Sequence, residues 1–264
     1  MTIVAGVDIG SLSTDVVILK DGKTIAQIVH PTGSNSGKAS ELALEKALNH
    51  VGVNLSDIAY IVSTGYGRIS AEFSDKQVTE ITCHGKGMHY LNPQIRTVID
   101  IGGQDSKAIK LTQHGDIEDF VMNDKCAAGT GRFLEVMASA LEVDLEEFTD
   151  ISMTARNGVD ISSMCTVFAE SEVVSLIAEG VSKDRIIRGL VESVGERTEA
   201  MAGRIHIEPP IGMSGGVAKN RGVVKALEER LNAQIYIPDE PQVVGALGAA
   251  LLAEQICTKH KQSS

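Results

Sequence analysis

The sequence lacks the features that mark several common classes of protein. No stretch approaches the roughly 18 consecutive apolar residues of a membrane-spanning helix. The first ten residues, MTIVAGVDIG, have neither the basic region nor the cleavage site of a signal peptide. Lys and Arg are scattered, and the net charge of -11 argues against nucleic acid or anionic lipid as the main partner. We therefore expect a cytoplasmic protein that binds neither membranes nor nucleic acid.

Paired cysteines and the two commonest nucleotide motifs are also missing. Cys83, Cys126, Cys165 and Cys257 are far apart and form no CxxC pair. This spacing indicates neither a disulfide framework nor a zinc site within one chain. The chain has no GxxxxGK[ST] motif and no GxGxxG after a strand, so a P-loop or Rossmann nucleotide site is not supported. A metal or nucleotide would have to be bound in another way.

A repeated pattern of strands and turns predicts an α/β fold with two similar lobes. VDIGSLSTDVVIL from Val7 and IDIGGQDSKAIKL from Ile99 keep Asp, Ile, Gly and Leu in register at an offset of 92 residues. Because the strand and turn context recurs as well, we interpret the match as a duplication. The strands of the two copies are predicted at 3–9, 15–20 and 24–30, and at 97–101, 106–111 and 117–122.

The rest of the chain is predicted to form helices and one further α/β segment. The first lobe is assigned to residues 1–92 and is completed by the terminal helix, while the second lobe takes residues 93–242. Apolar stripes and turn residues predict helices at 37–51, 81–91, 129–143, 170–180, 183–205, 219–231 and 243–257, and strands at 210–213 and 234–237.

Two turns place an aspartate and a glycine directly after an apolar strand, at 8–11 and at 100–103. The backbone N–H groups of such a turn can approach phosphate oxygens, and the carboxylate can hold hydrated Mg²⁺ beside them. Either turn alone could be an ordinary hairpin, but two copies in register favour a phosphate clamp. A third glycine turn, GMSGGVAKN at 212–220, suits an adenine-ribose face, and a plain strand-to-helix turn would have the same pattern.

Several longer motifs resemble those of a known family. They are GYGR at 65–68, DIGGQDSK at 100–107, NDKCAAGTGRFLE at 123–135 and CTVFAESEV at 165–173, with the small-residue helix GALGAALLA at 245–253. From Ile3 to about Cys257 the chain resembles the ATP-dependent activators of 2-hydroxyacyl-CoA dehydratases. That family includes the ATPase subunits of benzoyl-CoA reductases and lies within the actin, sugar-kinase and heat-shock-chaperone superfamily. The resemblance implies two actin-like (ribonuclease H-like) lobes with ATP in the cleft between them.

The resemblance also gives the cysteines a function. In that family the residues that align with Cys126 and Cys165 bind one [4Fe-4S] cluster at the axis of a homodimer. A cluster needs four thiolates, so two chains related by a two-fold axis would supply them. A helix that begins at about Ala127 would direct its positive end at the cluster. On spacing alone these would be two buried thiols; Cys83 and Cys257 match no ligand motif and are interpreted as packing residues.

The nucleotide residues follow from the same resemblance. Asp8 and Asp100 are predicted to hold Mg²⁺ or its waters, and Gln104, or its neighbour Asp105, to orient the hydrolytic water. Binding of ATP or ADP is predicted at Gly10, Ser11, Ser13, Gly102, Gly103, Gln104, Gly129, Gly215, Gly216, Lys219 and Asn220.

The implied activity is the transfer of one electron at low potential, driven by ATP. Lobe closure would move the helix after Cys126 and change the surroundings of the cluster. The acceptor would be a separate iron–sulfur enzyme such as a 2-hydroxyacyl-CoA dehydratase, and the upstream donor a ferredoxin or flavodoxin. A benzoyl-CoA reductase-like or double-cubane-cluster protein is an alternative acceptor. With five Phe, four Tyr and no Trp, the chain has no recognisable coenzyme A pocket, so the acyl substrate is expected to bind elsewhere.

Two other classes remain open at this point. Sugar and acetate kinases share the cleft with two hairpins, and a nucleotide-dependent regulator could bind ATP without redox chemistry. A chain of 264 residues leaves little room for the substrate-binding insertion of a kinase, and a kinase has no use for the two cysteine motifs.

Overall fold

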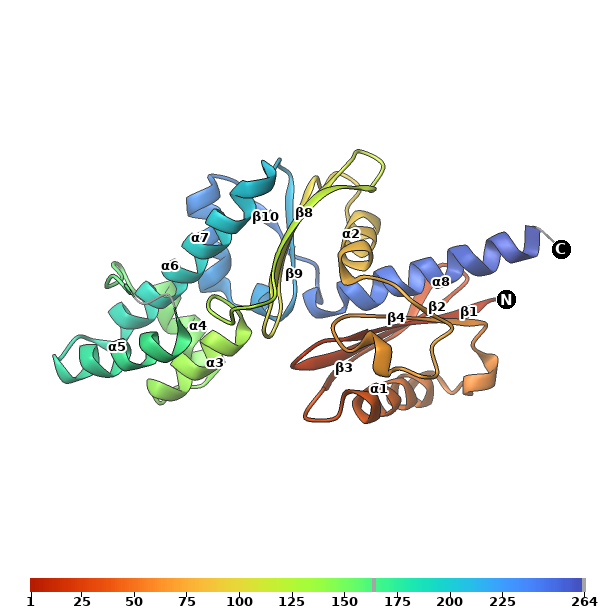
Figure 1. Cartoon of the computed structure of the whole chain (residues 1–264), viewed down its shortest axis with the longest axis horizontal. Coiled ribbons are helices and arrows are strands. Elements are labelled where there is room, and N and C mark those ends of the chain that lie inside the picture. Colours follow the sequence, from red (N-terminus) through yellow and green to blue (C-terminus); the bar gives the residue numbers. More distant parts are fainter. Residues whose placement is uncertain (163–164, 263–264) are drawn as a thin grey trace.

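The computed structural model describes residues 1–162 and 165–262 and contains two five-stranded sheets (Figure 1). The first sheet has the order β3-β2-β1-β4-β5, and the second has the order β10-β9-β6-β7-β8. The first is built from β1 (Ile3–Ile9), β2 (Ser13–Lys20), β3 (Lys23–Pro31), β4 (Tyr60–Thr64) and β5 (Lys76–Gln77). The second is built from β6 (Thr97–Ile101), β7 (Ser106–Leu111), β8 (Ile117–Asn123), β9 (Ile211–Ser214) and β10 (Ile235–Tyr236).

The registers of the two sheets confirm the duplication. Asp8 on β1 pairs with Asp15 on β2, and Asp100 on β6 pairs with Lys107 on β7, which preserves the offset of 92 residues. The second strand of each hairpin has its register shift at the equivalent place, after Ile18 in β2 and after Lys110 in β7. In each sheet the first strand also pairs in parallel with a later strand, β4 or β9. The α/β fold with two related lobes is therefore confirmed.

Two helices lie between the sheets. Helix α8 (Val244–Gln262) packs on the first sheet, against β1, β2 and β4, and also against α2 (Glu80–Leu91). The other side of α2 contacts the second sheet, where Ile81 and Met88 join Val98, Ile109 and Val244 in one buried cluster. A residue on α2 can therefore reach both lobes. The division at residue 92 stays a prediction.

The remaining helices cover the outer sides of the sheets. Helix α1 (Ser36–Val51) packs on the first sheet. It begins after Asn35, whose side chain accepts a hydrogen bond from the N–H of Lys38 at 2.9 Å. The second lobe carries α3 (Gly131–Ala140), α4 (Leu145–Thr154), α5 (Thr166–Ala178), α6 (Lys183–Ala202) and α7 (Arg221–Leu231). The ends of α3 and α5 lie far from both chain termini (Figure 1).

The expectation for the helix after Cys126 is wrong in one respect. It was placed at 129–143, with a start at about Ala127, but α3 begins only at Gly131. Gly129 has a φ of 84°, a left-handed value that a helix cannot include, and Thr130 is extended. Cys126 is therefore separated from α3 by a turn. Within the described residues, no helix is long and apolar enough to cross a membrane.

Candidate functional site

A cavity of about 710 Å³ lies between the two aspartate hairpins. This volume is within the usual range for a small-molecule or cofactor site. Most of the predicted nucleotide residues line this cavity: Asp8, Gly10, Ser11, Ser13, Asp100, Gly102, Gly103, Gly215, Gly216, Lys219 and Asn220. Asp105 lines it as well, whereas Gln104 is exposed and is not part of the lining.

Asp8 is held at the base of the cavity by close packing. Gly245, in the first turn of α8, leaves no space for a Cβ beside Asp8 Oδ2. His84 Nε2 on α2 lies 3.5 Å from the same oxygen. The small-residue helix that the sequence singled out therefore allows α8 to approach this carboxylate.

His84 connects the bases of the two hairpins. Its Nδ1 lies 3.2 Å from Asp100 Oδ1 and 3.1 Å from Ser214 Oγ, while its Nε2 faces Asp8. Burial alone would lower the pKa of His84, but the carboxylates of Asp100 and Asp8 outweigh burial and raise it. The two carboxylates, which belong to different sheets, thus favour the charged form of the imidazole.

Lys107 supplies a second buried positive charge beside Asp100. Its side chain is only 2% exposed, and its Nζ lies 2.9 Å from Asp100 Oδ2, 2.8 Å from Asp105 Oδ2 and 3.3 Å from Glu80 Oε2. Burial opposes the charge of Lys107, but these carboxylates raise its pKa well above the ordinary value. Burial would raise the pKa of Asp100, whereas His84 and Lys107 lower it. Asp100 is therefore ionised and fully partnered.

The equivalent position in the first hairpin has an acidic residue, Asp15, in place of a lysine. Asp15 is buried next to Asp8, and burial, followed by repulsion from Asp8, raises its pKa to about 8. Ser13 Oγ donates to Asp15 Oδ2 at 3.1 Å, but Asp15 Oδ1 is buried without a hydrogen-bond partner among the described residues. An oxygen donor of this kind suits Mg²⁺ or one of its waters. The residues present at Asp8 and Asp15 therefore fit a divalent cation.

The four cysteines occupy two kinds of environment. Cys126 and Cys165 are exposed and free, whereas Cys83 is buried and its pKa is raised to about 12, chiefly by burial. Cys257 is partly buried on α8. Exposed thiols can provide half of the thiolate set of a cluster shared between chains, and a thiolate at Cys83 is strongly disfavoured. The donor chemistry of Cys126 and Cys165 therefore fits an iron–sulfur group.

The two exposed cysteines differ in their distance along the chain from the helix that follows. Cys165 is the N-cap residue of α5. Cys126 lies in the loop between β8 and α3, where Asn123 fixes the backbone: its Nδ2 donates to the Cys126 carbonyl at 2.9 Å, and its Oδ1 accepts from the Cys126 N–H at 3.3 Å.

Hydrogen bonds join this loop to the second hairpin of the cavity. The N–H groups of Gly131 and Arg132 donate to the carbonyls of Gly102 and Gly103 at 2.9 and 2.8 Å. Thr130 Oγ1 donates to the Gly103 carbonyl as well, at 3.0 Å. The segment that follows Cys126 is therefore hydrogen-bonded directly to the second hairpin.

Several residues of the site were not expected from the sequence. Asp15 and Lys107 carried a signal, because they occupy equivalent positions in the two copies of the repeat, at the offset of 92 residues. His84 carried none, since its role depends on the packing of α2 between the sheets. Helix α4, which also lines the cavity, was missed although Asp144 begins it as a typical N-cap, accepting from the N–H of Glu147 at 2.8 Å.

The chain is similar to known proteins over nearly its whole length. Residues 5–253 match the BadF/BadG/BcrA/BcrD ATPase family. The activator of lactoyl-CoA dehydratase from Anaerotignum propionicum is 50% identical over 256 residues, which are 96% of this chain and 98% of that protein. The activator of the 2-hydroxyisocaproyl-CoA dehydratase from Clostridium difficile, solved with bound ADPNP, is 44% identical with a TM-score of 0.94, covering 100% of this chain and 98% of that one.

A more distant likeness concerns the fold alone. The ROK hexokinase of Thermus thermophilus is 16% identical with a TM-score of 0.55, and the match covers 97% of this chain and 100% of that one. Together these similarities confirm the actin-like, sugar-kinase-like architecture of two lobes.

Proposed function

Because the chain belongs to the BadF/BadG/BcrA/BcrD ATPase family, we propose that it is an ATP-dependent activator that delivers single electrons to a separate iron–sulfur enzyme. A 2-hydroxyacyl-CoA dehydratase is the class of acceptor that the most similar relatives support. The observation that carries the proposal is the set of hydrogen bonds between the cavity hairpin at Gly102 and Gly103 and the segment after Cys126.

The cavity would bind ATP with its phosphates between the two hairpins. The backbone of Gly10 and Ser11 faces that of Gly102 and Gly103 across the cavity, and the turn at Gly215 supports the adenosine. Asp8 and Asp15 would hold Mg²⁺ or its waters, because Asp15 Oδ1 is buried and has no hydrogen-bond partner among the described residues. Asp100 is already neutralised by His84 and Lys107, so its role is to position the hairpin.

Water attack on the terminal phosphate needs a group that orients it. Asp105 lines the cavity but is held by Lys107 at 2.8 Å, whereas Gln104 is exposed on the neighbouring turn. We retain Gln104 as the residue that orients the water once the lobes close, because its amide is not committed to an ion pair.

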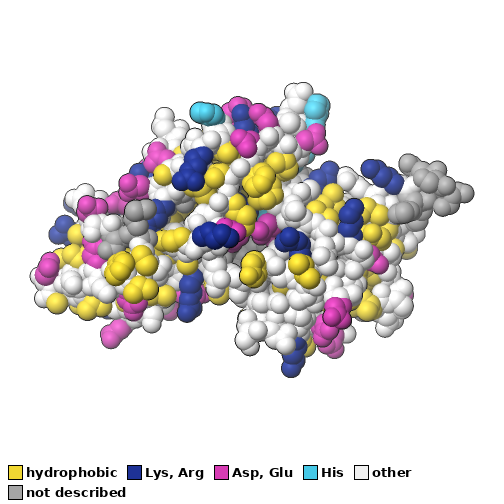
Figure 2. All heavy atoms as spheres, viewed as in Figure 1, with side chains coloured by type: hydrophobic (Ala, Val, Ile, Leu, Met, Phe, Trp, Pro, Cys, Tyr) yellow, Lys and Arg dark blue, Asp and Glu magenta, His cyan; other side chains and the backbone are white. Residues whose placement is uncertain are grey.

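Cys126 and Cys165 would hold a [4Fe-4S] cluster shared by two chains. When bound, this group supplies a low-potential electron. Helix α5, which follows Cys165, exposes Val167, Phe168 and Val174 to solvent, between 55% and 67% of each side chain. Figure 2 shows hydrophobic side chains gathered over this end of the molecule. Such a surface beside the ligands supports a homodimer whose two-fold axis passes close to Cys165.

Coupling between nucleotide and electron transfer would run through Thr130. Closure of the lobes moves the hairpin at Gly102 and Gly103, and the bonded N-terminus of α3 moves with it. Because the single hydroxyl proton of Thr130 is shared between the Gly103 and Ala127 carbonyls, at 3.0 and 2.6 Å, the turn that carries Cys126 follows. The cysteine ligand therefore changes position when the nucleotide changes.

The first test is the presence of the cluster. Protein purified without oxygen should contain iron and acid-labile sulfide and show the broad visible absorption of an iron–sulfur cluster. Cys126→Ser should lose both and keep nucleotide binding, while Cys83→Ser should keep the absorption because Cys83 is buried away from solvent. Wild-type protein without iron or sulfide would refute the redox function and leave an ATPase.

The second test concerns coupling. Thr130→Val removes the hydroxyl bond to Gly103 without changing the size of the side chain. Loss of ~0.5–1.5 kcal/mol, the usual net value of a hydrogen bond, predicts an ATP-dependent electron transfer rate that is lower by several-fold to about tenfold. The cluster and ATP affinity should be unchanged. Thr154→Val, which loses a hydroxyl bond to Ile151 within α4, is the matched control, and equal rates in the two variants would contradict the proposed coupling.

A further inference from the structure

Arg197 on α6 packs against the loop that carries Cys126. Its Cδ and Cβ lie 3.5 and 3.7 Å from the point where a Cβ on Gly129 would stand. The side chain therefore lies in van der Waals range of the turn between Cys126 and α3. This turn depends on Gly129, whose φ of 84° is one that other residues rarely adopt.

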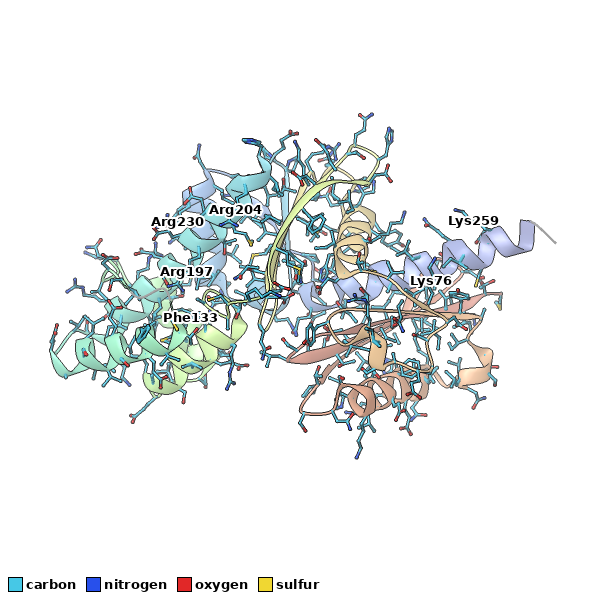
Figure 3. All side chains as sticks on the ribbon, viewed as in Figure 1. Lys76, Phe133, Arg197, Arg204, Arg230 and Lys259 are labelled. Atoms are coloured by element: carbon cyan, nitrogen blue, oxygen red, sulfur yellow. The ribbon has the colours of Figure 1, made fainter. Side chains whose placement is uncertain are left out.

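The guanidinium is held in place by an aromatic ring. The carbon at its centre lies 5.2 Å from the centroid of the Phe133 ring, within the range of a cation–π interaction (Figure 3). Phe133 is fully buried in the first turns of α3. Arg197 thus contacts both parts of the segment that joins Cys126 to the cavity, and α6 provides a rigid base for it.

The charge of Arg197 is near enough to Cys126 for the two side chains to interact electrostatically. Burial lowers the pKa of Arg197, whereas the nearby Cys126, and to a smaller extent Glu196, oppose that effect. Glu196 also lies 3.5 Å from Arg230, so its negative charge is shared with a second arginine. Arg197 therefore brings a partly desolvated positive charge close to one of the two proposed cluster ligands.

We propose that Arg197 is a positioning residue for the iron–sulfur cluster. It supports the Cys126 loop, and its positive charge makes the cluster easier to reduce. This inference rests on the proposed function. A cluster gains a negative charge on reduction, and a fixed positive charge nearby stabilises the reduced form more than the oxidised form. In a homodimer the effect would be applied from both chains.

The experiment measures the reduction potential of the cluster in the anaerobic, nucleotide-free homodimer. Arg197→Gln removes the charge and keeps a polar side chain, Arg197→Lys keeps the charge, and Arg204→Gln makes the same change at an exposed arginine beyond the end of α6 (Figure 3). Iron and sulfide are measured for each protein, and reduction is followed by electron paramagnetic resonance in a redox titration.

We expect Arg204→Gln and Arg197→Lys to titrate close to wild type. Arg197→Gln should be harder to reduce, with at least a tenfold lower ratio of reduced to oxidised cluster at a fixed potential, which is a shift of ~59 mV for one electron. A fully loaded Arg197→Gln protein with the wild-type potential would overturn the inference.

If Arg197→Gln loses the cluster, its potential cannot be measured, and Arg197→Lys then tests the role of the charge. Normal iron content and a near wild-type potential in Arg197→Lys would support the role of the charge, and equal loss of iron in both variants would overturn it. Wild-type protein without iron is a separate outcome, which refutes the proposed function itself and this inference with it.

Discussion

Replacement of Lys107 by methionine should strongly destabilise the second lobe. The ammonium group of Lys107 is the buried cation shared by Asp100, Asp105 and Glu80, with N–O distances of 2.8 to 3.3 Å. Methionine has about the same volume as lysine, but it leaves these carboxylates without the positive charge. Removal of one partner from a buried ion pair typically costs ~3–5 kcal/mol, because the remaining charge stays desolvated. We expect a loss of that size in the free energy of unfolding at pH 7.5, measured with urea.

The pH dependence gives the same prediction an independent check. Burial already raises the pKa of Glu80 in wild type, and Lys107 is the strongest influence that lowers it, so removal of Lys107 should raise the folded-state pKa of Glu80 further above its unfolded value. A carboxyl group of this kind stabilises the fold below its unfolded pKa and loses that contribution as the pH rises. In wild type, Asp100 has the opposite behaviour, since its pKa is lowered and its contribution is lost as the pH falls. The difference between variant and wild type should therefore shrink from pH 7.5 to pH 5.5.

A matched control lies on the same strand. Lys110 pairs with the exposed carboxylates of Glu118 and Glu208 at the surface, so Lys110→Met should change the unfolding free energy little at either pH. If Lys107→Met unfolded within ~1 kcal/mol of wild type at pH 7.5, or showed the same deficit at both pH values, the interpretation of Lys107 as a buried counter-charge would be wrong.

Three further predictions test other parts of the site. The pKa of Asp15 in the folded protein, about 8, exceeds its value in the unfolded chain. The stability of wild type without metal and nucleotide should therefore decrease as the pH rises from about 4 to about 8, and Asp15→Asn should remove that decrease in urea unfolding. Gly245→Ala places a methyl group against Asp8 and should weaken nucleotide binding at least tenfold by calorimetry, whereas Gly203→Ala, with open space around it, should not. Phe168→Asp should dissociate the proposed homodimer in sedimentation, and Leu55→Asp, also on an exposed apolar residue, should leave it intact.

The sequence predicted the two hairpins well because their signals are local. Alternating apolar residues, the Gly turns and the offset of 92 residues determine which strands pair and in which register, and the structure has that register. The start of α3 was placed too early because small residues at 127–130 resemble a helix N-terminus, and only the conformation of Gly129 excludes it. The functions of Cys126, Cys165 and Gln104, and the cytoplasmic location, remain predictions.

The base of the cavity could not be predicted because it depends on contacts between distant segments. His84 reaches Asp8 and Asp100 only because α2 lies between the two sheets. No pattern near residue 84 indicates this contact. Lys107 was visible as part of a motif, but its three ion pairs require the fold to bring Glu80 next to the second hairpin.

The duplicated hairpins differ at one pair of equivalent positions, and this difference determines where a cation can be held. Position 15 is an acid and position 107 is a base, although each pairs with the aspartate of its own hairpin. Asp100 has Lys107 in addition to His84, whereas Asp8 and Asp15 have His84, 3.5 Å from Asp8, and Asp15 Oδ1 has no hydrogen-bond partner among the described residues. A divalent ion that arrives with ATP would complete the first hairpin and, through the phosphates, connect it to the second. Since the second hairpin is bonded to the Cys126 segment, this asymmetry would direct the effect of nucleotide binding toward the lobe that carries both exposed cysteines.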